Sequence, residues 1–283
     1  MLSTKMRRMN RDTVASRVVW KALEPIHAVT YFADECDQAF RAAGLKGFWM
    51  GYFAGRSAPM GEVGPELVVA TFFNFHPSMV ERALPDAWTF ASATQVLDVR
   101  SSAAAGVLRR LVDGIDDAAA SLVQLLQRVI DDADPGGRPL FAANRGIPEI
   151  EDPVAALWQA TTSLREHRGD GHVAALTAEG LGGCEAHALI ATVNDVPRDL
   201  YLRSRGWSDD DWLAAKTRLL GRGDARELHA RIEACTDALA LVPYQALSDG
   251  ELDEMLRLAG AIAATIDASG LYPYPNPIGL PAP

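Results

Sequence analysis

The chain has 283 residues, of which 48% are hydrophobic and 23% are charged, and its net charge is −10. It has no apolar run of about 18 residues, which excludes a membrane-spanning helix. Its three cysteines are too few and too far apart for a disulfide framework or a cysteine zinc site. The N-terminus lacks the apolar segment of a signal peptide, so these features predict a cytoplasmic protein.

The positive charges gather at the N-terminus. Residues 1–20 carry a net charge of +4, because five cationic side chains stand against Asp12: Lys5, Arg7, Arg8, Arg11 and Arg17. The rest of the chain therefore carries −10 − 4 = −14. A body this acidic repels a phosphate backbone at long range, and chain ends are usually loose. We therefore predict that residues 1–20 form a flexible basic tail and not a nucleic-acid-binding arm.

Helical periodicity dominates the chain from residue 25 onward. Residues 25–43 repeat apolar side chains at helical spacing, and Gly44 is expected to end that helix. Residues 67–75 are apolar and fit a buried helix or a strand, whereas residues 103–132 predict one long helix. Further helices are predicted over residues 153–164, 186–193, 209–220, 227–241 and 252–268. No segment alternates convincingly with a period of two, so the predicted fold is mainly α.

The chain also resembles itself at a long shift. Gly51 matches Gly171 (171 − 51 = 120), and other matches follow in the same order: Ala54 with Ala174, Asn74 with Asn194, and Pro77 with Pro197. We interpret this pattern as a tandem duplication, with one half at residues 21–150 and the other at residues 151–283. Two such halves most simply pack as a pseudo-twofold dimer within one chain. The oligomeric state is left open.

The second half contains the spacing of a helix-turn-helix. Residues 197–205 predict a short helix, residues 206–208 predict a turn, and residues 209–220 predict a second helix. Ser208 is in the position to cap that second helix, because its hydroxyl can accept a free backbone N–H of the first turn.

Several strings in both halves resemble one family. They are LREHRGDGHVAAL, RGWSDDDWLAA, ARIEACTDAL and YPYPNPIGLP in the second half, and YFADECDQAF, GYFAGRSAP and GRPLFAAN in the first. With these strings the chain resembles, over nearly all of its length after residue 20, a largely uncharacterised actinobacterial helix-turn-helix family. The central region of that family is similar to MarR-type winged-helix repressors. The resemblance therefore implies winged helix-turn-helix-like halves.

Two features disfavour DNA binding. Only residues 221–224 separate the would-be recognition helix from the next helix, which leaves no room for a wing of the usual length. That recognition helix begins with Asp209, Asp210 and Asp211, and three carboxylates at its N-terminus would repel the DNA that it faces. We expect a repressor-like scaffold that has kept a ligand cleft and lost the DNA. The alternative is a MarR-like, ligand-responsive transcriptional regulator that binds DNA.

The expected partner is a small, largely apolar metabolite bound between the two halves, since clefts between helices are mostly apolar with a few polar groups. In the aromatic-rich first half, Tyr31, Tyr52 and Arg56 are the best pocket candidates, because a buried hydroxyl or guanidinium group needs a partner. His27 would lie near the pseudo-twofold axis. The second half adds two further candidate ligand contacts, Arg165 and Glu185.

The densest cluster of proton-transferring side chains lies at residues 165–172. Gly169 and Gly171 would let the backbone turn sharply there, so that the side chains could converge. The candidate catalytic residues are His172, His167, Glu166 and Asp170.

Three interpretations of this cluster stay open. It supplies acid–base groups, with His172 oriented by a neighbouring carboxylate; it binds a metal; or it is a salt-bridged junction between helices. Because no HExxH or Hx3H spacing is present, no metal is predicted, and any cofactor is unknown. The remaining histidines, His76, His187 and His229, are expected on the surface or in the core. Motifs of the common nucleotide-binding and hydrolase classes are missing.

Overall fold

Every regular element that the structure describes is helical. The computed structural model describes residues 2–280, with side chains from residue 15 onward, and this range contains fourteen α-helices, three short 3-10 helices and no strand. The prediction of a mainly α fold is therefore confirmed. The N-terminal part (residues 2–150) contains α1 (Leu2–Phe32), α2 (Asp34–Ala42), α3 (Phe48–Ser57), α4 (Pro65–Phe72), α5 (Pro77–Glu81), α6 (Ala93–Leu111), α7 (Ile115–Asp132) and α8 (Pro139–Arg145). The C-terminal part (residues 151–280) contains α9 (Pro153–Ala178), α10 (Gly183–Asn194), α11 (Arg198–Arg205), α12 (Asp209–Leu220), α13 (Ala225–Leu241) and α14 (Asp249–Ala268).

Two predicted helices are interrupted where the chain changes direction. The helix expected over residues 103–132 is split between α6 and α7, where Gly114 adopts a φ of +66°. The helix expected over residues 25–43 is split at Ala33, whose backbone is extended before α2 begins. Apolar residues on both sides of each break enter the same hydrophobic core, so the breaks allow consecutive helices to pack on shared neighbours. The apolar stretch at 67–75 is helical as far as Phe72.

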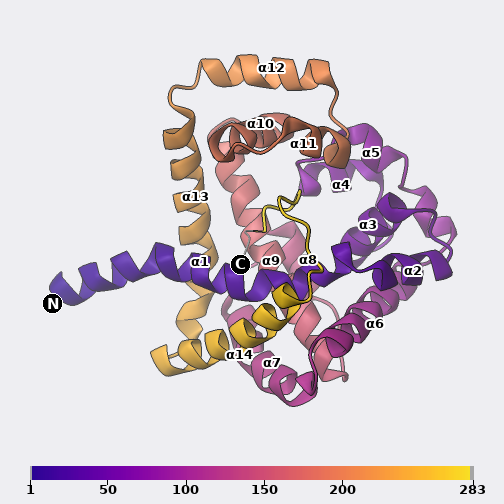
Figure 1. Cartoon of the computed structure of the whole chain (residues 1–283), viewed down its shortest axis with the longest axis vertical. Helices are drawn as coiled ribbons and strands as arrows, with labels where there is room; N and C mark the ends of the chain where they lie inside the picture. The colour runs from indigo at the N-terminus through magenta and orange to yellow at the C-terminus, as the bar shows by residue number, and fades with distance from the viewer. Residues whose placement is uncertain (1, 281–283) are drawn as a thin grey trace.

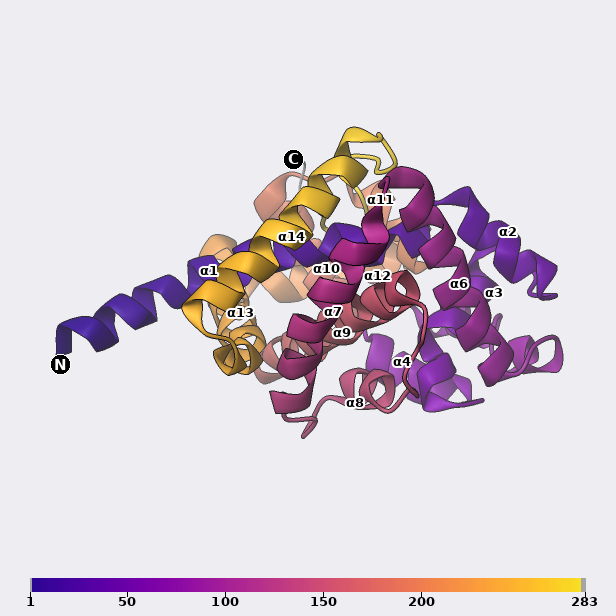
Figure 2. The same ribbon diagram turned by 90° about the horizontal axis from the view of Figure 1, so that it is seen from below.

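Helix α9 runs through the centre of the molecule (Figure 1). It contacts α1, α6, α7, α8 and α13, and its first turn is capped by Asp152, whose carboxylate accepts the backbone N–H groups of Val154 and Ala155. Because neighbours surround it, α9 has buried residues on every face and no amphipathic stripe. Its Leu157 and Trp158 belong to the largest hydrophobic core, together with residues of α1, α6, α7 and α14. Figure 2 shows α14 beside α1 and α7.

The turn expected at Gly169 and Gly171 is wrong, because α9 continues through both residues to Ala178. Neither glycine has a positive φ. Gly171 instead permits a close approach, since a Cβ atom there would lie 2.9 Å from Arg138 Nη1 and 3.4 Å from Leu239 Cβ of α13. The side chains of residues 165–172 therefore radiate from a helix, at about 100° per residue, and do not converge.

The predicted helix-turn-helix is present as α11 and α12, within one residue of the expected boundaries. The predicted cap is confirmed, because the Ser208 hydroxyl accepts the backbone N–H of Asp211. Residues 221–224 lead directly into α13, and the described range 2–280 contains no strand that could form a wing.

The turn between α11 and α12 is docked against the N-terminal part. Trp207 Nε1 donates to the carbonyl oxygen of Asn74 at 3.0 Å, and the backbone N–H of His76 donates to the carbonyl oxygen of Arg205 at 2.8 Å. Gly206, with a φ of +78°, has no space for a side chain, because a Cβ atom there would lie 2.4 Å from Met79 Cγ. The helix-turn-helix is thus tied to α5 and the loop before it, and is not a free module.

The basic residues expected in a flexible tail are only partly described. The side chains of Lys5, Arg7, Arg8 and Arg11 lie outside the described residues, so the tail stays a prediction for them. Arg17 is part of α1 and forms ion pairs with Asp237 at 2.9 Å and with Glu233 at 2.6 Å, both in α13.

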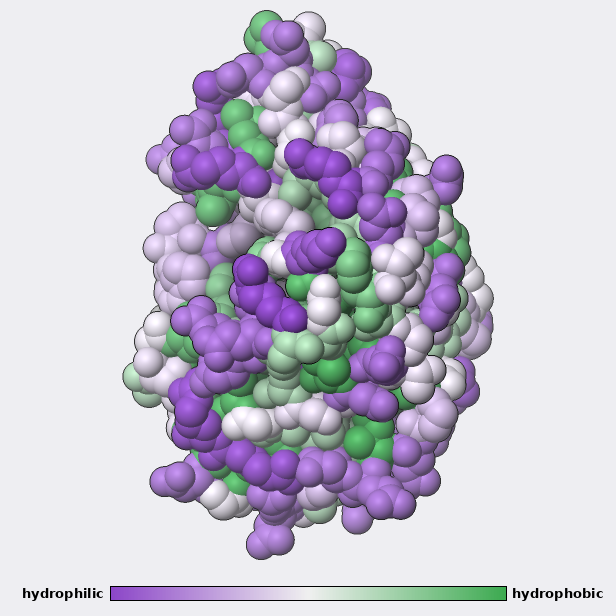
Figure 3. Space-filling model, turned by 90° about the vertical axis from the view of Figure 1, so that its right-hand side faces the viewer, coloured by the Kyte–Doolittle hydropathy of each residue, from purple (hydrophilic) through white to green (hydrophobic). Residues whose placement is uncertain are grey.

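The N-terminal part has a second core, built around Phe53, Phe72 and Phe75. Some of its large apolar residues reach the surface, since Phe48, Leu67 and Phe90 are 39%, 45% and 39% exposed. Figure 3 shows the face that lies at the right of Figure 1, where hydrophobic residues gather in the middle with hydrophilic residues above and below.

Candidate functional site

A cavity of about 200 Å³ lies between the two parts of the chain, and we call it the main cleft. Its walls come from α3 and α4 on one side, from α9, α10, α11 and α13 on the other, and from the C-terminal segment at residues 277–279. Most of the wall is apolar or aromatic, including Phe72, Phe75, Val173, Leu176, Leu189 and Ile190. The polar lining includes Tyr52, Arg56, Arg165, His172, His187 and Arg205.

A smaller cavity of about 30 Å³ lies beside it and is called the small cavity. Four residues predicted from the sequence to bind a ligand line it, together with the predicted catalytic Glu166: His27, Tyr31, Tyr52 and Arg56. Tyr52 and Arg56 line both spaces, so they form the partition between the small cavity and the main cleft.

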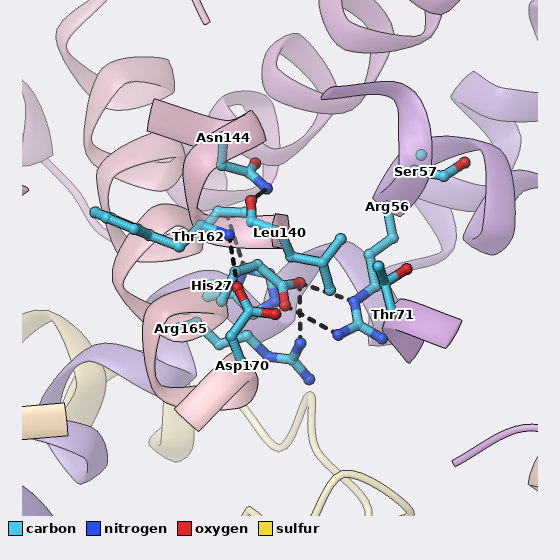
Figure 4. A network of polar contacts seen from close by, with 12 residues as sticks. His27, Arg56, Ser57, Thr71, Leu140, Asn144, Thr162, Arg165 and Asp170 are labelled. Carbon is cyan, nitrogen blue, oxygen red and sulfur yellow. Dashed lines mark hydrogen bonds and ion pairs between the residues drawn. The ribbon is translucent and has the colours of Figure 1, made fainter. Parts of the chain in front are cut away.

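A buried carboxylate holds this partition in place. Glu166 is 0% exposed, and its Oε1 and Oε2 accept hydrogen bonds from Arg56 Nε at 2.8 Å and Nη2 at 2.9 Å. Arg165 Nη1 adds a contact of 3.0 Å to Oε1. Figure 4 shows both guanidinium groups pointing at the same carboxylate. Burial disfavours the charged form, but the two arginines hold the pKa of Glu166 well below its usual range. Glu166 is therefore an ionised structural anchor and cannot serve as a general acid.

His27 is part of a hydrogen-bonded chain in the small cavity. The Thr162 hydroxyl donates to the carbonyl oxygen of Trp158 at 2.8 Å, so it must accept from His27 Nδ1, which lies 2.9 Å away. The other ring nitrogen, Nε2, then carries a lone pair and accepts from the Tyr31 hydroxyl at 3.0 Å. Burial, and next the charge of Arg165, hold the pKa of His27 well below its usual range. The ring is therefore neutral.

His172 has the same arrangement in the main cleft. The Thr236 hydroxyl donates to the carbonyl oxygen of Ile232 at 2.8 Å, so the His172 Nδ1 at 2.9 Å must be the donor to Thr236. The lone pair is thus on Nε2. Burial lowers the pKa of His172, against the opposing charge of Glu233. His172 therefore has a neutral ring, and its basic nitrogen, Nε2, forms no hydrogen bond with Thr236.

His167 and Asp170 line neither the main cleft nor the small cavity, although Asp170 lines a third, more open space beside α4 and α8. His167 packs edge-on against Phe141, with 4.9 Å between the ring centroids, and burial lowers its pKa to about 4. Asp170 Oδ2 accepts the backbone N–H of Phe141 at 2.9 Å and so caps the first turn of α8. Burial raises the pKa of Asp170 to about 6. These two residues fasten α8 to α9.

Glu185 also lies away from the cleft. Its carboxylate accepts the backbone N–H of Gly182 at 2.5 Å, at the start of α10, and pairs with Arg218 of α12. Of the ten candidate residues, the structure brings six to the partition and the small cavity and leaves His172 on the far wall of the main cleft. The remaining three, His167, Asp170 and Glu185, stabilise helix ends and packing.

Several lining residues were not singled out from the sequence. His187 and His229, expected on the surface or in the core, line the main cleft, as do Tyr201 and Arg205. The position of Arg205 in the last turn of α11 is ordinary for a cation that complements a helix dipole, so nothing local indicates a role in a cavity.

These observations define a class of protein. Its described residues form helices only, its helix-turn-helix pair is docked on the N-terminal part, and a cleft lies between the two parts. A model of a helix-turn-helix family matches residues 16–273, so the chain belongs to that family. No curated protein and no solved structure matches the chain. In the range that the structure describes, no helix is long and apolar enough to cross a membrane, and no group of three His, Cys, Asp or Glu side chains is arranged to hold a metal ion.

Proposed function

We propose that the chain binds a small, mainly apolar organic molecule in the main cleft. The observation that carries this proposal is the cavity of about 200 Å³ between the two parts of the chain, whose wall combines apolar and aromatic side chains with polar ones. Ligand sites in helical proteins have this composition. The polar groups would orient the molecule, and the aromatic wall would supply most of the contact area.

We further propose that His172 can accept a proton from the bound molecule. Its Nδ1 is engaged by Thr236, which fixes the tautomer and leaves Nε2 as the basic atom in the cleft wall. A general base needs a neutral ring at working pH, and the lowered pKa of His172 keeps the ring neutral. Nitrogen-15 NMR of the histidine rings tests this step, with His172→Gln to assign the signal. A protonated Nε2 in the free protein would contradict it.

The cleft is best explained as the interface of two related halves, similar to a repressor dimer in one chain. Packing of the long helices supports this proposal, because α6 and α7 contact α9 while α13 and α14 contact α1. The partners start 132 residues apart for α6 and α13 (225 − 93) and 134 apart for α7 and α14 (249 − 115). A superposition of α6 and α7 on α13 and α14 should therefore also carry α9 onto α1 by a near-twofold rotation. A different rotation would contradict the duplication.

A DNA-binding regulator is the alternative, and the surface of α12 disfavours it. Three acidic residues occupy its first turn. Its two cations are engaged, since Lys216 donates to Thr192 at 2.9 Å and Arg218 pairs with Glu185. A recognition helix needs free donors toward bases and phosphates, and the winged-helix comparison is therefore proposed for the scaffold only.

Two glycines, one in the cleft wall and one outside it, allow a test of ligand binding. Gly169 lines the main cleft, and a Cβ atom there would meet only Glu166 Oε2 at an ordinary 3.5 Å. Gly169→Leu should therefore fill the cleft without disturbing α9, and the better helix propensity offsets part of any strain. Gly106→Leu is the matched control, because Gly106 lies in α6 with nothing within 4 Å.

Ligand-detected NMR with a set of neutral and acidic aromatic fragments is the measurement. We expect binding to the unmodified protein and to Gly106→Leu, and no binding to Gly169→Leu at an unchanged melting temperature. Fragments that bind all three proteins equally would place the binding outside the main cleft and end the proposal.

A further inference from the structure

Three buried polar atoms in the wall of the main cleft have no hydrogen-bond partner. They are Arg205 Nε, His187 Nε2 and Asn74 Oδ1, and a fourth such atom in the described part of the chain, Arg100 Nε, belongs to a residue outside this cleft. Buried polar groups are nearly always paired. Three exceptions around one cavity indicate that a bound molecule supplies the missing partners.

Of the three residues that carry these atoms, only Arg205 is a cation. Its side chain is buried, at 7% exposure, and its described hydrogen bonds go to two backbone carbonyl oxygens, Ser204 at 3.1 Å and Pro277 at 2.5 Å. The guanidinium group lies 4.6 Å above the ring of Phe75. Arg56 and Arg165 share the carboxylate of Glu166, whereas Arg205 forms no ion pair with an acidic side chain of the described residues and donates to backbone carbonyl oxygens instead. A buried charge without a counter-charge is costly, so this arginine marks the position of an anionic group.

His187 and Asn74 add two more unpartnered polar atoms to the wall of the main cleft. His187 is 5% exposed and stacks on Tyr201 at 4.6 Å. Its Nε2 has no hydrogen-bond partner, and the ring is neutral because burial holds the pKa of His187 well below its usual range. Asn74 follows Phe73, whose φ of +59° is strained for an aromatic residue. This turn, closed by a 2.5 Å hydrogen bond from Asn74 N–H to the carbonyl oxygen of Phe72, holds the amide at the cleft. Both atoms need a hydrogen-bond partner from the ligand.

We propose that the main cleft binds a small hydroxylated carboxylate with a flat apolar body. This inference rests on the proposed function, that the cleft holds a small molecule. The carboxylate accepts from Arg205 Nε–H, and a hydroxyl group of the ligand, which can donate or accept, pairs with His187 Nε2 or donates to Asn74 Oδ1. One carboxylate suffices, because Arg205 is the one arginine of the cleft wall that forms no ion pair in the described residues. The flat body fits beside the rings of Phe75 and Tyr201, on which Arg205 and His187 already lie.

Matched acids and amides test the charge requirement. The probes are 3-hydroxybenzoate, 4-hydroxybenzoate, their amides and benzoate, with affinities measured by titration calorimetry and ligand-detected NMR. We expect at least one hydroxybenzoate to bind about tenfold more tightly than its amide, since hydrogen bonds to charged groups are the stronger ones. Arg205→Gln should remove this difference. The control, Arg145→Gln, should keep it, because Arg145 also donates to two backbone carbonyl oxygens, of Ala133 and Asp131, but lies outside the cleft.

His187→Phe tests whether the hydroxyl group of the ligand pairs with His187. This test remains valid even if Arg205→Gln does not fold. His187→Phe keeps a ring to stack on Tyr201 and removes Nε2. We expect it to weaken hydroxybenzoate about tenfold and to leave benzoate unchanged. Equal losses for both acids would overturn the role of His187.

The outcomes also separate this inference from the proposed function. Amides that bind as tightly as the acids, with binding abolished by Gly169→Leu, would leave the cleft as a ligand site and overturn the carboxylate. The inference also fails if no hydroxybenzoate binds while other fragments still bind in the cleft. If every fragment binds Gly169→Leu as tightly as it binds the unmodified protein, the proposed function itself is overturned.

Discussion

Arg56 and Glu166 lie 110 residues apart in the sequence and form a two-pronged ion pair, with Nε–Oε1 and Nη2–Oε2 distances of 2.8 Å and 2.9 Å. The pair joins α3 to α9 at the partition between the main cleft and the small cavity. Arg56 also lies 4.2 Å above the ring of Phe72. The shape of both cavities therefore depends on one buried carboxylate, which is why Glu166 has a structural role even though it sits beside a candidate site.

Replacing that carboxylate should destabilise the fold. Glu166→Gln keeps the size of the side chain but leaves Arg56 buried without a counter-charge and Arg165 with only Glu24 at 3.7 Å. We therefore expect a loss of about 3–5 kcal/mol in the free energy of unfolding. Urea denaturation measures it. Asp116→Asn is the control, because Asp116 pairs with Arg109 at 2.6 Å on the surface, where water and salt screen the pair and its loss should change stability little. Equal effects of the two variants would contradict a structural role for Glu166.

The two glycines of α9 should respond to alanine with opposite signs. Gly169→Ala is expected to stabilise the protein by roughly 0.5–1 kcal/mol, because alanine is the better helix former and its Cβ atom meets only an ordinary contact. Gly171→Ala is expected to destabilise it, because its Cβ atom would lie 2.9 Å from Arg138 Nη1. Arg138 is held by the carbonyl oxygens of His167 and Leu239 and so cannot move away freely. Thermal unfolding of both variants decides the question, and equal signs would contradict it.

His167 should make stability rise with pH between about pH 4 and pH 6.5. Burial lowers its pKa from 6.5 to about 4, so in this window the unfolded chain binds a proton that the folded chain does not. Stability is then fully present above pH 6.5 and is lost as the pH falls toward 4. At about 1.4 kcal/mol per pKa unit the effect is on the order of 3 kcal/mol. It is measured as the difference in unfolding free energy between the unmodified protein and His167→Leu across this range, and a difference that stays constant would refute it.

Asp170 should act in the opposite direction over nearly the same window. Burial raises its pKa to about 6, so the folded chain binds a proton that the unfolded chain has lost, and stability falls as the pH rises from about 4 to 6. Asp170→Asn keeps an oxygen to accept the N–H of Phe141 and removes the titration. Its stability relative to the unmodified protein should therefore increase with pH through this range in denaturant titrations. A relative stability that decreases would show that the carboxylate is favoured in its charged form.

DNA should not bind in a salt-sensitive, sequence-specific way. The turn before α12 is docked on the N-terminal part through Trp207 and Asn74, and the first turn of α12 is acidic. An electrophoretic mobility shift with the upstream DNA of the protein's own gene, at physiological salt and with competitor DNA, is the measurement. A specific shift at nanomolar protein would favour the regulator instead.

Local patterns in the sequence were enough to predict the class of fold and several helix ends. Apolar spacing predicts the helices over residues 209–220 and 227–241, Ser208 predicts the start of α12, and Gly44 follows the end of α2 with a φ of +99°. These predictions succeed because caps, helix-ending glycines and amphipathic spacing act within a few residues of each other. The same reasoning missed the break at Gly114, where the packing of α6 and α7 decides the direction of the chain.

The sequence by itself also brought Glu166, His27, Tyr31, Tyr52, Arg56 and Arg165 into view as polar groups that need partners. Only the tertiary structure decided which partners they have. It continued α9 through residues 165–172, so that Glu166 points to Arg56 while Asp170 caps α8. It also left Arg205 and His187 buried with unpaired nitrogens. A buried polar atom is satisfied or unsatisfied according to every segment packed around it, and in this chain those segments lie far apart in the sequence.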